Sequence, residues 1–265
     1  MGIVVTNLSK SFPANGGKVK AVDHVSFKVR SGEIFGLLGP NGAGKTTTVR
    51  LLSTILRPDS GTAVLDGHDL ARDPIGVRKI IGMLPEEVGL YDRLTPIEVL
   101  YYYGKLYGMP EEQIKRRIEE LILTLNLEEY AEIRCCDLSK GTKQKVSVAR
   151  VFLHEPPILL LDEPTAGIDA ISARAIRQMI TGAKNANRTI MYSTHVMPEA
   201  ERICDRIGII NRGKIVAVGT FDELRRGREG LEDIFVRLVK EEHSEKPKER
   251  RGKATKGKKK WGMWR

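Results

Sequence analysis

The sequence predicts an α/β protein built around a mostly parallel β-sheet. Short apolar, β-branched runs alternate along the chain with segments of helical periodicity, as strands joined by crossover helices do. A glycine-rich loop at 39–46, GPNGAGKT, follows one of these runs and precedes a helical segment. The chain has 265 residues, of which 41% are hydrophobic, and this is enough for one large domain with a sizeable core.

Seven apolar runs are the expected strands. In chain order they are 3–5, 25–29, 34–38, 80–84, 158–161, 189–192 and 207–210. Between about 95 and 151 the pattern is helical with charged faces, which predicts an inserted helical subdomain at about 87–153. From 217 we expect a closing turn and then a C-terminal helix at about 221–240. The domain therefore spans 1–240, and the Lys-, Gly- and Glu-rich segment 241–265 is expected to be a disordered basic tail.

Composition and charge exclude several classes of protein. No uncharged apolar run approaches the roughly 18 residues of a membrane-spanning helix, and no basic-then-apolar leader is present. Cys135, Cys136 and Cys204 lack the spacing of a zinc site or a disulfide framework, so we expect a reduced, cytosolic protein. Residues 246–265 hold ten Lys or Arg and one Glu, a net charge of +9, whereas the whole chain carries +10. The basic character therefore belongs to the tail.

The glycine-rich loop predicts a phosphate-binding site. Glycines let several backbone N–H groups converge on phosphate oxygens, and the N-terminus of the following helix adds a favourable dipole. Lys45 would reach the β- and γ-phosphates of a nucleotide, and the Thr46 hydroxyl would ligate Mg²⁺. An ordinary glycine-rich turn is the alternative, but the preceding strand, the spacing and the Lys-Thr pair together favour a phosphate site. The expected nucleotide-binding residues are Gly39, Pro40, Asn41, Gly42, Ala43, Gly44, Lys45, Thr46 and Thr47.

Two adjacent carboxylates end another apolar strand, ILLLDE at 158–163. Asp162 would hold Mg²⁺ through water, as an acid at this place does in other phosphate-loop enzymes. Glu163 could then polarise the attacking water as a general base. Adjacent acids at a strand end are often only a solvated turn, and the phosphate loop earlier in the chain gives this pair its catalytic interpretation.

Three further segments make the sequence resemble the ABC-type ATPases. LSKGTKQ at 138–144 is similar to their signature motif, TAGID at 165–169 to their D-loop, and His195 to their switch histidine. The five motifs stand in the order found in the family, and the resemblance covers about residues 1–220. It implies a phosphate-loop NTPase core with a mostly parallel sheet, an N-terminal antiparallel β portion and an inserted helical subdomain.

The resemblance also implies roles for residues outside the phosphate loop. Ser139, Gly141 and Asp169 would contact nucleotide, and His195 would take part in catalysis. Phe12 stands where the family stacks an aromatic ring on adenine, although it could equally belong to the core.

Three residues depart from the usual motifs. Glu86, in LPEE at 84–87, replaces the usual Gln of the Q-loop. Its carboxylate can still approach Mg²⁺ or the catalytic water, but it cannot donate a hydrogen bond as an amide does. Lys140 replaces the first glycine of the signature and Thr142 replaces its Gln. The combination of LPEE and SKG resembles the exporter-type branch, which handles drugs, antibiotics, ions or lipids.

The resemblance implies an ATP- and Mg²⁺-dependent motor that works as a dimer, because each phosphate loop in this family faces the partner's signature motif. Since Glu163 and His195 are both present, a homodimer would have two active sites. Separate membrane-spanning permease subunits would carry the substrate, so the protein would be cytoplasmic and peripheral on the inner face of the cell membrane. The alternative is a soluble ABC ATPase acting on nucleic acid, ribosomes or cofactor assembly.

Two segments suggest partners. The dense tyrosines of 87–107 lie where the family receives the coupling helix of its membrane subunit, and aromatic residues suit interfaces. The basic tail could be a solvated extension, a nucleic-acid contact or a contact with an anionic membrane surface. Trp261 and Trp264 favour the membrane surface, because indole rings prefer the bilayer interface, and nucleic acid is the less favoured partner.

Overall fold

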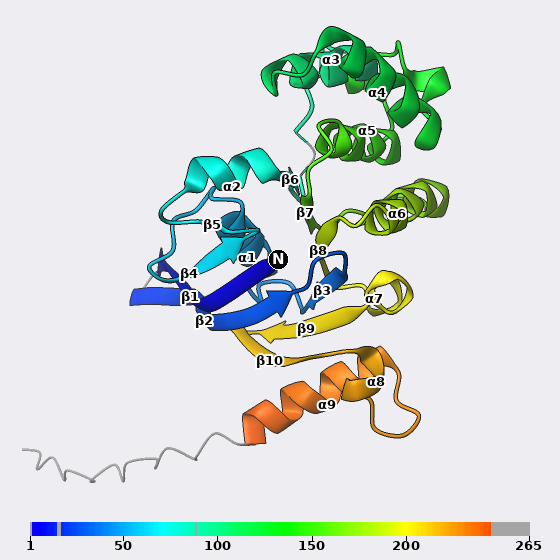
Figure 1. The fold of residues 1–265 in the computed structure, drawn as a ribbon. Coiled ribbons are helices and arrows are strands. Elements are labelled where there is room, and N and C mark those ends of the chain that lie inside the picture. Colours follow the sequence, from blue (N-terminus) through cyan, green and yellow to red (C-terminus); the bar gives the residue numbers. More distant parts are fainter. Residues whose placement is uncertain (1, 15–16, 88, 245–265) are drawn as a thin grey trace, which may run out of the picture.

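The computed structural model describes residues 2–14, 17–87 and 89–244, in which two β-sheets pack with helices (Figure 1). The smaller sheet is antiparallel, with the strand order β2-β1-β4-β5. Its strands are β1 (Ile3–Ala14), β2 (Gly17–Val29), β4 (Ser60–Leu65) and β5 (His68–Asp69). This sheet is the predicted N-terminal antiparallel portion.

The larger sheet is mostly parallel, as predicted. Its order is β10-β9-β3-β8-β7-β6, and only β10 pairs with its neighbour in antiparallel fashion. Every residue of β3, β7 and β8 is buried, as expected for parallel strands covered on both faces. The strands are β3 (Ile34–Leu38), β6 (Ile81–Leu84), β7 (Ile158–Asp162), β8 (Thr189–Thr194), β9 (Arg206–Asn211) and β10 (Lys214–Gly219).

Helices cover the larger sheet and extend the molecule at both ends (Figure 1). α3 and α4 lie together at one end, with α5 between them and the sheet, and α9 lies at the opposite end. α3 begins at a capping box in which Thr95 and Glu98 bond each other's backbone N–H groups. The helices are α1 (Lys45–Leu52), α2 (Pro74–Ile80), α3 (Pro96–Leu106), α4 (Glu111–Thr124), α5 (Lys140–Phe152), α6 (Ala170–Asn185), α7 (Met197–Ile203), α8 (Phe221–Leu224) and α9 (Leu231–Ser244), with 3₁₀ turns at Glu128–Tyr130 and Cys135–Asp137.

The larger sheet separates two apolar clusters. Ile158 and Leu160 of β7 pack in the cluster that includes residues of the smaller sheet and of α1. Leu159 and Leu161 point to the opposite face and pack with side chains of α4, α5 and α6. The strand is therefore apolar without interruption until Asp162, where it reaches the edge of the sheet.

The strand order brings distant segments of the chain together. β8 lies between β3 and β7, with Leu38 opposite Thr194 and Asp162 opposite Ser193. The carboxyl ends of three parallel strands therefore meet at one edge of the sheet, which is where open α/β sheets bind ligands.

The sequence prediction misses three short strands, β4, β5 and β10. Both hairpins involved turn through two residues with positive φ: Asp66 and Gly67 at 43° and 94°, and Arg212 and Gly213 at 46° and 79°. Two-residue turns of this kind join antiparallel strands, so the Asp-Gly pair was an available signal.

The C-terminal prediction is wrong in two respects. Residues 217–219 belong to β10, and the helix expected at about 221–240 is divided into α8 and α9. α8 ends before Arg225, which is extended, and Gly227 has a φ of 66°, which a continuous right-handed helix does not contain. α9 continues to Ser244, so residues 241–244 of the expected tail are helical, and 245–265 lie outside the described residues. No helix within the described ranges is both long and apolar enough to cross a bilayer.

Candidate functional site

The glycine-rich loop turns directly from β3 into α1. Gly44 precedes the helix with a φ of 107°, and a Cβ added there would lie 2.3 Å from the carbonyl oxygen of Ala21. Only glycine therefore fits at this position. No side chain caps the N-terminus of α1, and N–H groups of a first helical turn have no partner within the helix, so they suit an anion.

A cavity of about 460 Å³ opens beside this loop. It is lined by Phe12, Ala21, Asn41, Gly42, Gly44, Lys45, Thr46, Thr47, Glu86 and Glu163. All except Ala21 were expected site residues, contributed by four separate segments of the chain. Phe12 lies on β1 with 36% of its surface exposed, so its interpretation as a core residue is wrong.

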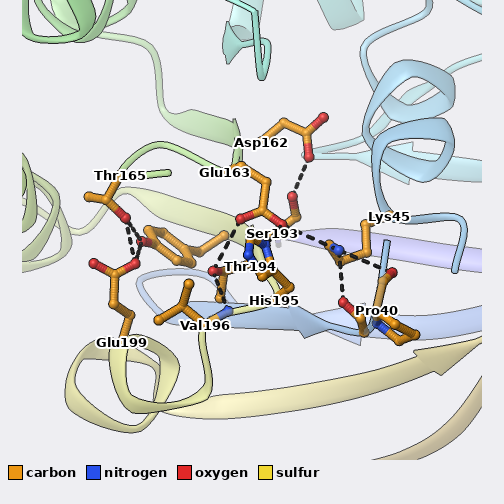
Figure 2. Close-up of polar contacts among 12 residues, drawn as sticks. Pro40, Lys45, Asp162, Glu163, Thr165, Ser193, Thr194, His195, Val196 and Glu199 are labelled. Atoms are coloured by element: carbon orange, nitrogen blue, oxygen red, sulfur yellow. Dashed lines mark hydrogen bonds and ion pairs between the residues drawn. The ribbon is translucent and has the colours of Figure 1, made fainter. Parts of the chain in front are cut away.

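Lys45 is buried and bonded to its own loop. Its ammonium donates to the carbonyl oxygens of Gly39, at 2.8 Å, and Pro40, at 3.3 Å. It also lies 3.3 Å from Oε1 of Glu163, and both side chains are only 5% exposed (Figure 2). Such a buried ion pair needs each partner, because removing one leaves the other charge uncompensated.

Glu163 is held in an unusual backbone conformation. Its φ is 48°, a region that residues other than glycine adopt at a free-energy cost, and strain of this kind is concentrated at functional sites. Its Oε1 lies 2.9 Å from Nδ1 of His195, while Thr194 donates to its Oε2 at 3.3 Å. Figure 2 shows the carboxylate between Lys45 and His195. The structure thus joins the end of β7 to the loop after β8.

Asp162 is completely buried at the end of β7. Burial raises the pKa of its carboxyl, while the hydroxyls of Ser193 and Thr46 act to lower it. Ser193 donates to Oδ1, and Oδ2 has no hydrogen-bond partner among the described residues. A buried carboxylate oxygen without a donor, close to a threonine hydroxyl, fits a hard cation such as Mg²⁺.

The signature and D-loop residues gather at a second place. Ser139 caps α5, and Asp169 caps α6 by accepting from the backbone N–H groups of Ile171 and Ser172. A Cβ added to Gly141 would lie 2.6 Å from Oδ2 of Asp169, so these two motifs touch. None of Ser139, Gly141 and Asp169 lines the cavity beside Lys45.

Glu86 lies between the two places. It is exposed and lines both the cavity beside the phosphate loop and a second cavity of about 660 Å³. This second cavity includes Lys140 and Gly167, and a Cβ on Gly167 would lie 2.6 Å from the Lys140 ammonium. The two motif departures, Glu86 and Lys140, therefore face the same space.

Sequence reasoning missed the polar end of β8. Ser193 and Thr194 bond Asp162 and Glu163, and a signal existed, because polar residues ending an apolar strand are as suggestive as the acids ending β7. It also missed Tyr192 and Glu199, which bond the hydroxyl of Thr165. No pattern in the sequence indicates that connection, because the three residues lie on separate elements.

Comparisons with a family model and with known proteins identify the same family. The family described as ABC transporter matches residues 22–166. The chain is 40% identical over 237 residues to the ABC transporter ATP-binding protein NatA of Bacillus subtilis, covering 88% of this chain and 96% of that protein. It is 38% identical over 239 residues to the doxorubicin resistance ATP-binding protein DrrA of Mycobacterium tuberculosis, covering 90% and 71%.

Solved structures show the same relationship. An ATP-binding subunit of an ABC transporter superposes with a TM-score of 0.82 at 33% identity, covering 90% of this chain and all of that one. A dimeric bacterial ABC transporter cassette superposes with a TM-score of 0.76 at 25% identity, covering 85% and 99%.

Proposed function

The chain belongs to the ABC transporter family of ATP-binding proteins, and we propose that two copies of it drive export through separate membrane-spanning subunits. It is an ATP hydrolase of that family. The observation that carries the catalytic part of this proposal is the position of Glu163 Oε1, which lies 3.3 Å from the Lys45 ammonium and 2.9 Å from Nδ1 of His195.

Hydrolysis requires a base beside the phosphates, and we assign that role to Glu163. Lys45 would exchange the carbonyls of Gly39 and Pro40 for the β- and γ-phosphate oxygens of ATP, which attract an ammonium more strongly. This exchange frees Glu163 to accept a proton from water, while His195 keeps its carboxylate in place. Phe12 would stack on adenine, and Glu86 would orient water from the far side of the cavity.

The residues present fit Mg²⁺, although no group of three or more His, Cys, Asp or Glu within the described ranges is arranged to hold a metal alone. This agrees with a cation bound by one or two protein groups and the nucleotide phosphates. Thr46 and Asp162 would hold it, with Glu86 nearby, and the bound ion would neutralise charge on the transferred phosphoryl group.

The second motif cluster supports a dimer. Ser139, Gly141 and Asp169 lie apart from the cavity in their own chain, so a second copy is needed to bring a signature to a bound ATP. We propose a homodimer, since each copy supplies Glu163 and His195. The similarity to a dimeric cassette supports this arrangement.

Light scattering tests the dimer with Glu163→Gln, which should slow hydrolysis and keep ATP bound. This variant should double its mass with ATP and remain a monomer with ADP. Lys45→Ala should remain a monomer in both, because it loses the charge on the phosphates. A Glu163→Gln variant that binds ATP and stays monomeric would refute the dimer.

A tyrosine surface on and beside α3 supports a membrane-spanning partner. We define it as Tyr91, Tyr102, Tyr103, Leu106 and Tyr107, of which all but Tyr103 are exposed. Tyr102 makes edge contacts with the rings of Tyr91 and Tyr103 at 5.5 Å, and Arg150 lies under Tyr103 at 5.0 Å. Preordered aromatic side chains with polar tips suit a protein interface. We propose that the coupling segment of a permease binds here.

Export is the proposed direction, and it is supported by the relatives named for resistance to doxorubicin and linearmycin. The cargo contacts would lie in the permease. The protein would then be cytoplasmic and peripheral on the inner face of the membrane, with its basic tail against anionic lipid.

A further inference from the structure

A buried hydroxyl pair links the D-loop to the helix that follows His195. The side chain of Thr165, 8% exposed, lies 3.0 Å from the Tyr192 hydroxyl on β8. Both hydroxyls donate to Oε2 of Glu199 on α7, Thr165 at 2.5 Å and Tyr192 at 3.0 Å (Figure 2). Oε2 of Glu199 thus connects α7 to the D-loop and to β8.

Glu199 is itself fixed from the other side. Its Oε1 accepts from Arg177 of α6 at 2.7 Å, with the two side chains 14% and 20% exposed. Three donors therefore converge on this carboxylate, and charge-assisted hydrogen bonds of this kind are the strong ones. Burial raises the pKa of Tyr192, so its hydroxyl stays protonated and able to donate.

The segment that these bonds hold begins at the proposed base. The backbone N–H of Glu163 donates to the Ser193 carbonyl at 3.0 Å, and its own carbonyl accepts from Ala166 at 3.1 Å. Gln144 of α5 donates to the carbonyl of Pro164 at 2.9 Å. Thr165 is the next anchor, and it is the only one of these that reaches α7. A backbone held at a φ of 48° persists only where its surroundings impose it.

We propose that Glu199 is a positioning residue for ATP hydrolysis: by holding the Thr165 hydroxyl, it fixes the strained backbone that aims the Glu163 carboxylate at the nucleotide. The inference rests on the proposed role of Glu163 as the base. The loop after β8 would then be linked to the active site twice, through His195 and through Glu199 of α7. The two links would keep a fixed distance between the loops that follow β7 and β8.

The geometry predicts a specific kinetic signature. Thr165, Tyr192 and Glu199 do not line the cavity beside Lys45, so ATP affinity should not depend on them. Displacement of the base should instead lower kcat, since a shift of about 1 Å at a catalytic group can cost about 100-fold. A role in stability alone would lower the melting temperature and leave kcat of the folded protein unchanged.

The experiment compares Thr165→Val, Tyr192→Phe, Glu199→Gln and the double variant Thr165→Val/Glu199→Gln with the full chain. Glu201→Gln is the matched control, because Glu201 is exposed on the same helix. We expect kcat to fall about 10-fold in each single variant, with KM for ATP within about twofold of the parent value. The double variant should be no slower than Glu199→Gln, because both changes break one connection.

Unchanged kcat in Thr165→Val and Tyr192→Phe would overturn the proposal, and so would a rise in KM alone. These two substitutions keep the side-chain shape, so they carry the test even if Glu199→Gln fails to fold. A Glu163→Gln variant with the parent rate would refute the role of the base itself. An inactive Glu163→Gln beside fully active Thr165 and Tyr192 variants would refute only the positioning role.

Discussion

At the carboxyl edge of the parallel sheet, charged side chains are buried and held against one another, whereas on α3 large aromatic side chains are exposed to solvent. Lys45, Asp162 and Glu163 are at most 5% exposed, while Tyr102 and Tyr107 are 45% and 46% exposed. Burying a charge and exposing an aromatic ring both oppose folding. Each arrangement therefore suits the role proposed for it, which is catalysis at the sheet edge and binding of a partner on α3.

The largest expected effect is at the sheet edge. Glu163→Gln should retain ATP and lower kcat about 10²- to 10⁴-fold, since that is the usual contribution of a positioned base. Lys45→Ala should instead lose ATP binding, because the phosphates lose their ammonium and Glu163 loses its counter-charge. Steady-state phosphate release and the ATP dissociation constant separate the two. A Gln variant that turns over at the parent rate would place the base elsewhere.

A smaller effect is expected on the tyrosine surface. Tyr102→Glu should weaken binding of the membrane partner about 30-fold, as loss of an interface aromatic often does, with no change in the ATPase rate of the isolated chain. Leu123→Glu is the control, because Leu123 is 61% exposed on α4 and lies outside the tyrosine surface. Transport and isolated ATPase activity should be measured together. If Tyr102→Glu lowers both equally, the two regions are not separate in function.

His154 sharpens the comparison, because it connects the tyrosine surface to the amino end of β6, away from the carboxyl edge. Its ring stacks on Tyr107 at 3.8 Å, its Nε2 lies 3.3 Å from the Ile81 carbonyl, and its buried Nδ1 has no partner among the described residues. Burial lowers the pKa of His154 below its ordinary value of 6.5. As pH falls below 6.5, His154 binds a proton in the unfolded chain but stays neutral in the folded chain. The free energy of unfolding should therefore decrease as pH falls, until the pKa of His154 in the folded chain is passed.

Urea unfolding at about pH 7.5 and about pH 5.5 measures this loss. His154→Gln should reduce the difference between the two pH values, because an amide does not titrate there. Equal differences in parent and variant would show that His154 does not cause the pH dependence.

The smallest effect on catalysis is expected from the tail, whose residues 246–265 lie outside the described ranges. Deleting them should leave the ATPase rate unchanged, since they contain none of the site residues. Binding to anionic vesicles should weaken, most clearly at low salt, because each basic residue near the surface contributes on the order of 1 kcal/mol. Equal vesicle binding by both forms would refute membrane contact, and RNA retained only by the full chain would favour nucleic acid.

The fold was predictable where a segment carries its own signal. The apolar runs at β3, β7 and β8 are buried on both faces, so their composition alone indicates parallel strands. β10 lacks this signal because four of its six residues are only half-buried. β4 and β5 depend on pairing with β1 and on the turn at Asp66 and Gly67.

The site divides in the same way. The sequence by itself determined the phosphate loop and the acids after β7, because each depends on neighbouring residues whose backbone and charge act locally. Only the tertiary structure decided that His195 would meet Glu163, and that Thr165, Tyr192 and Glu199 would share one bond network. Those contacts follow from β8 lying between β3 and β7. The order of the strands depends on how the whole core packs, so no single segment of the sequence determines it.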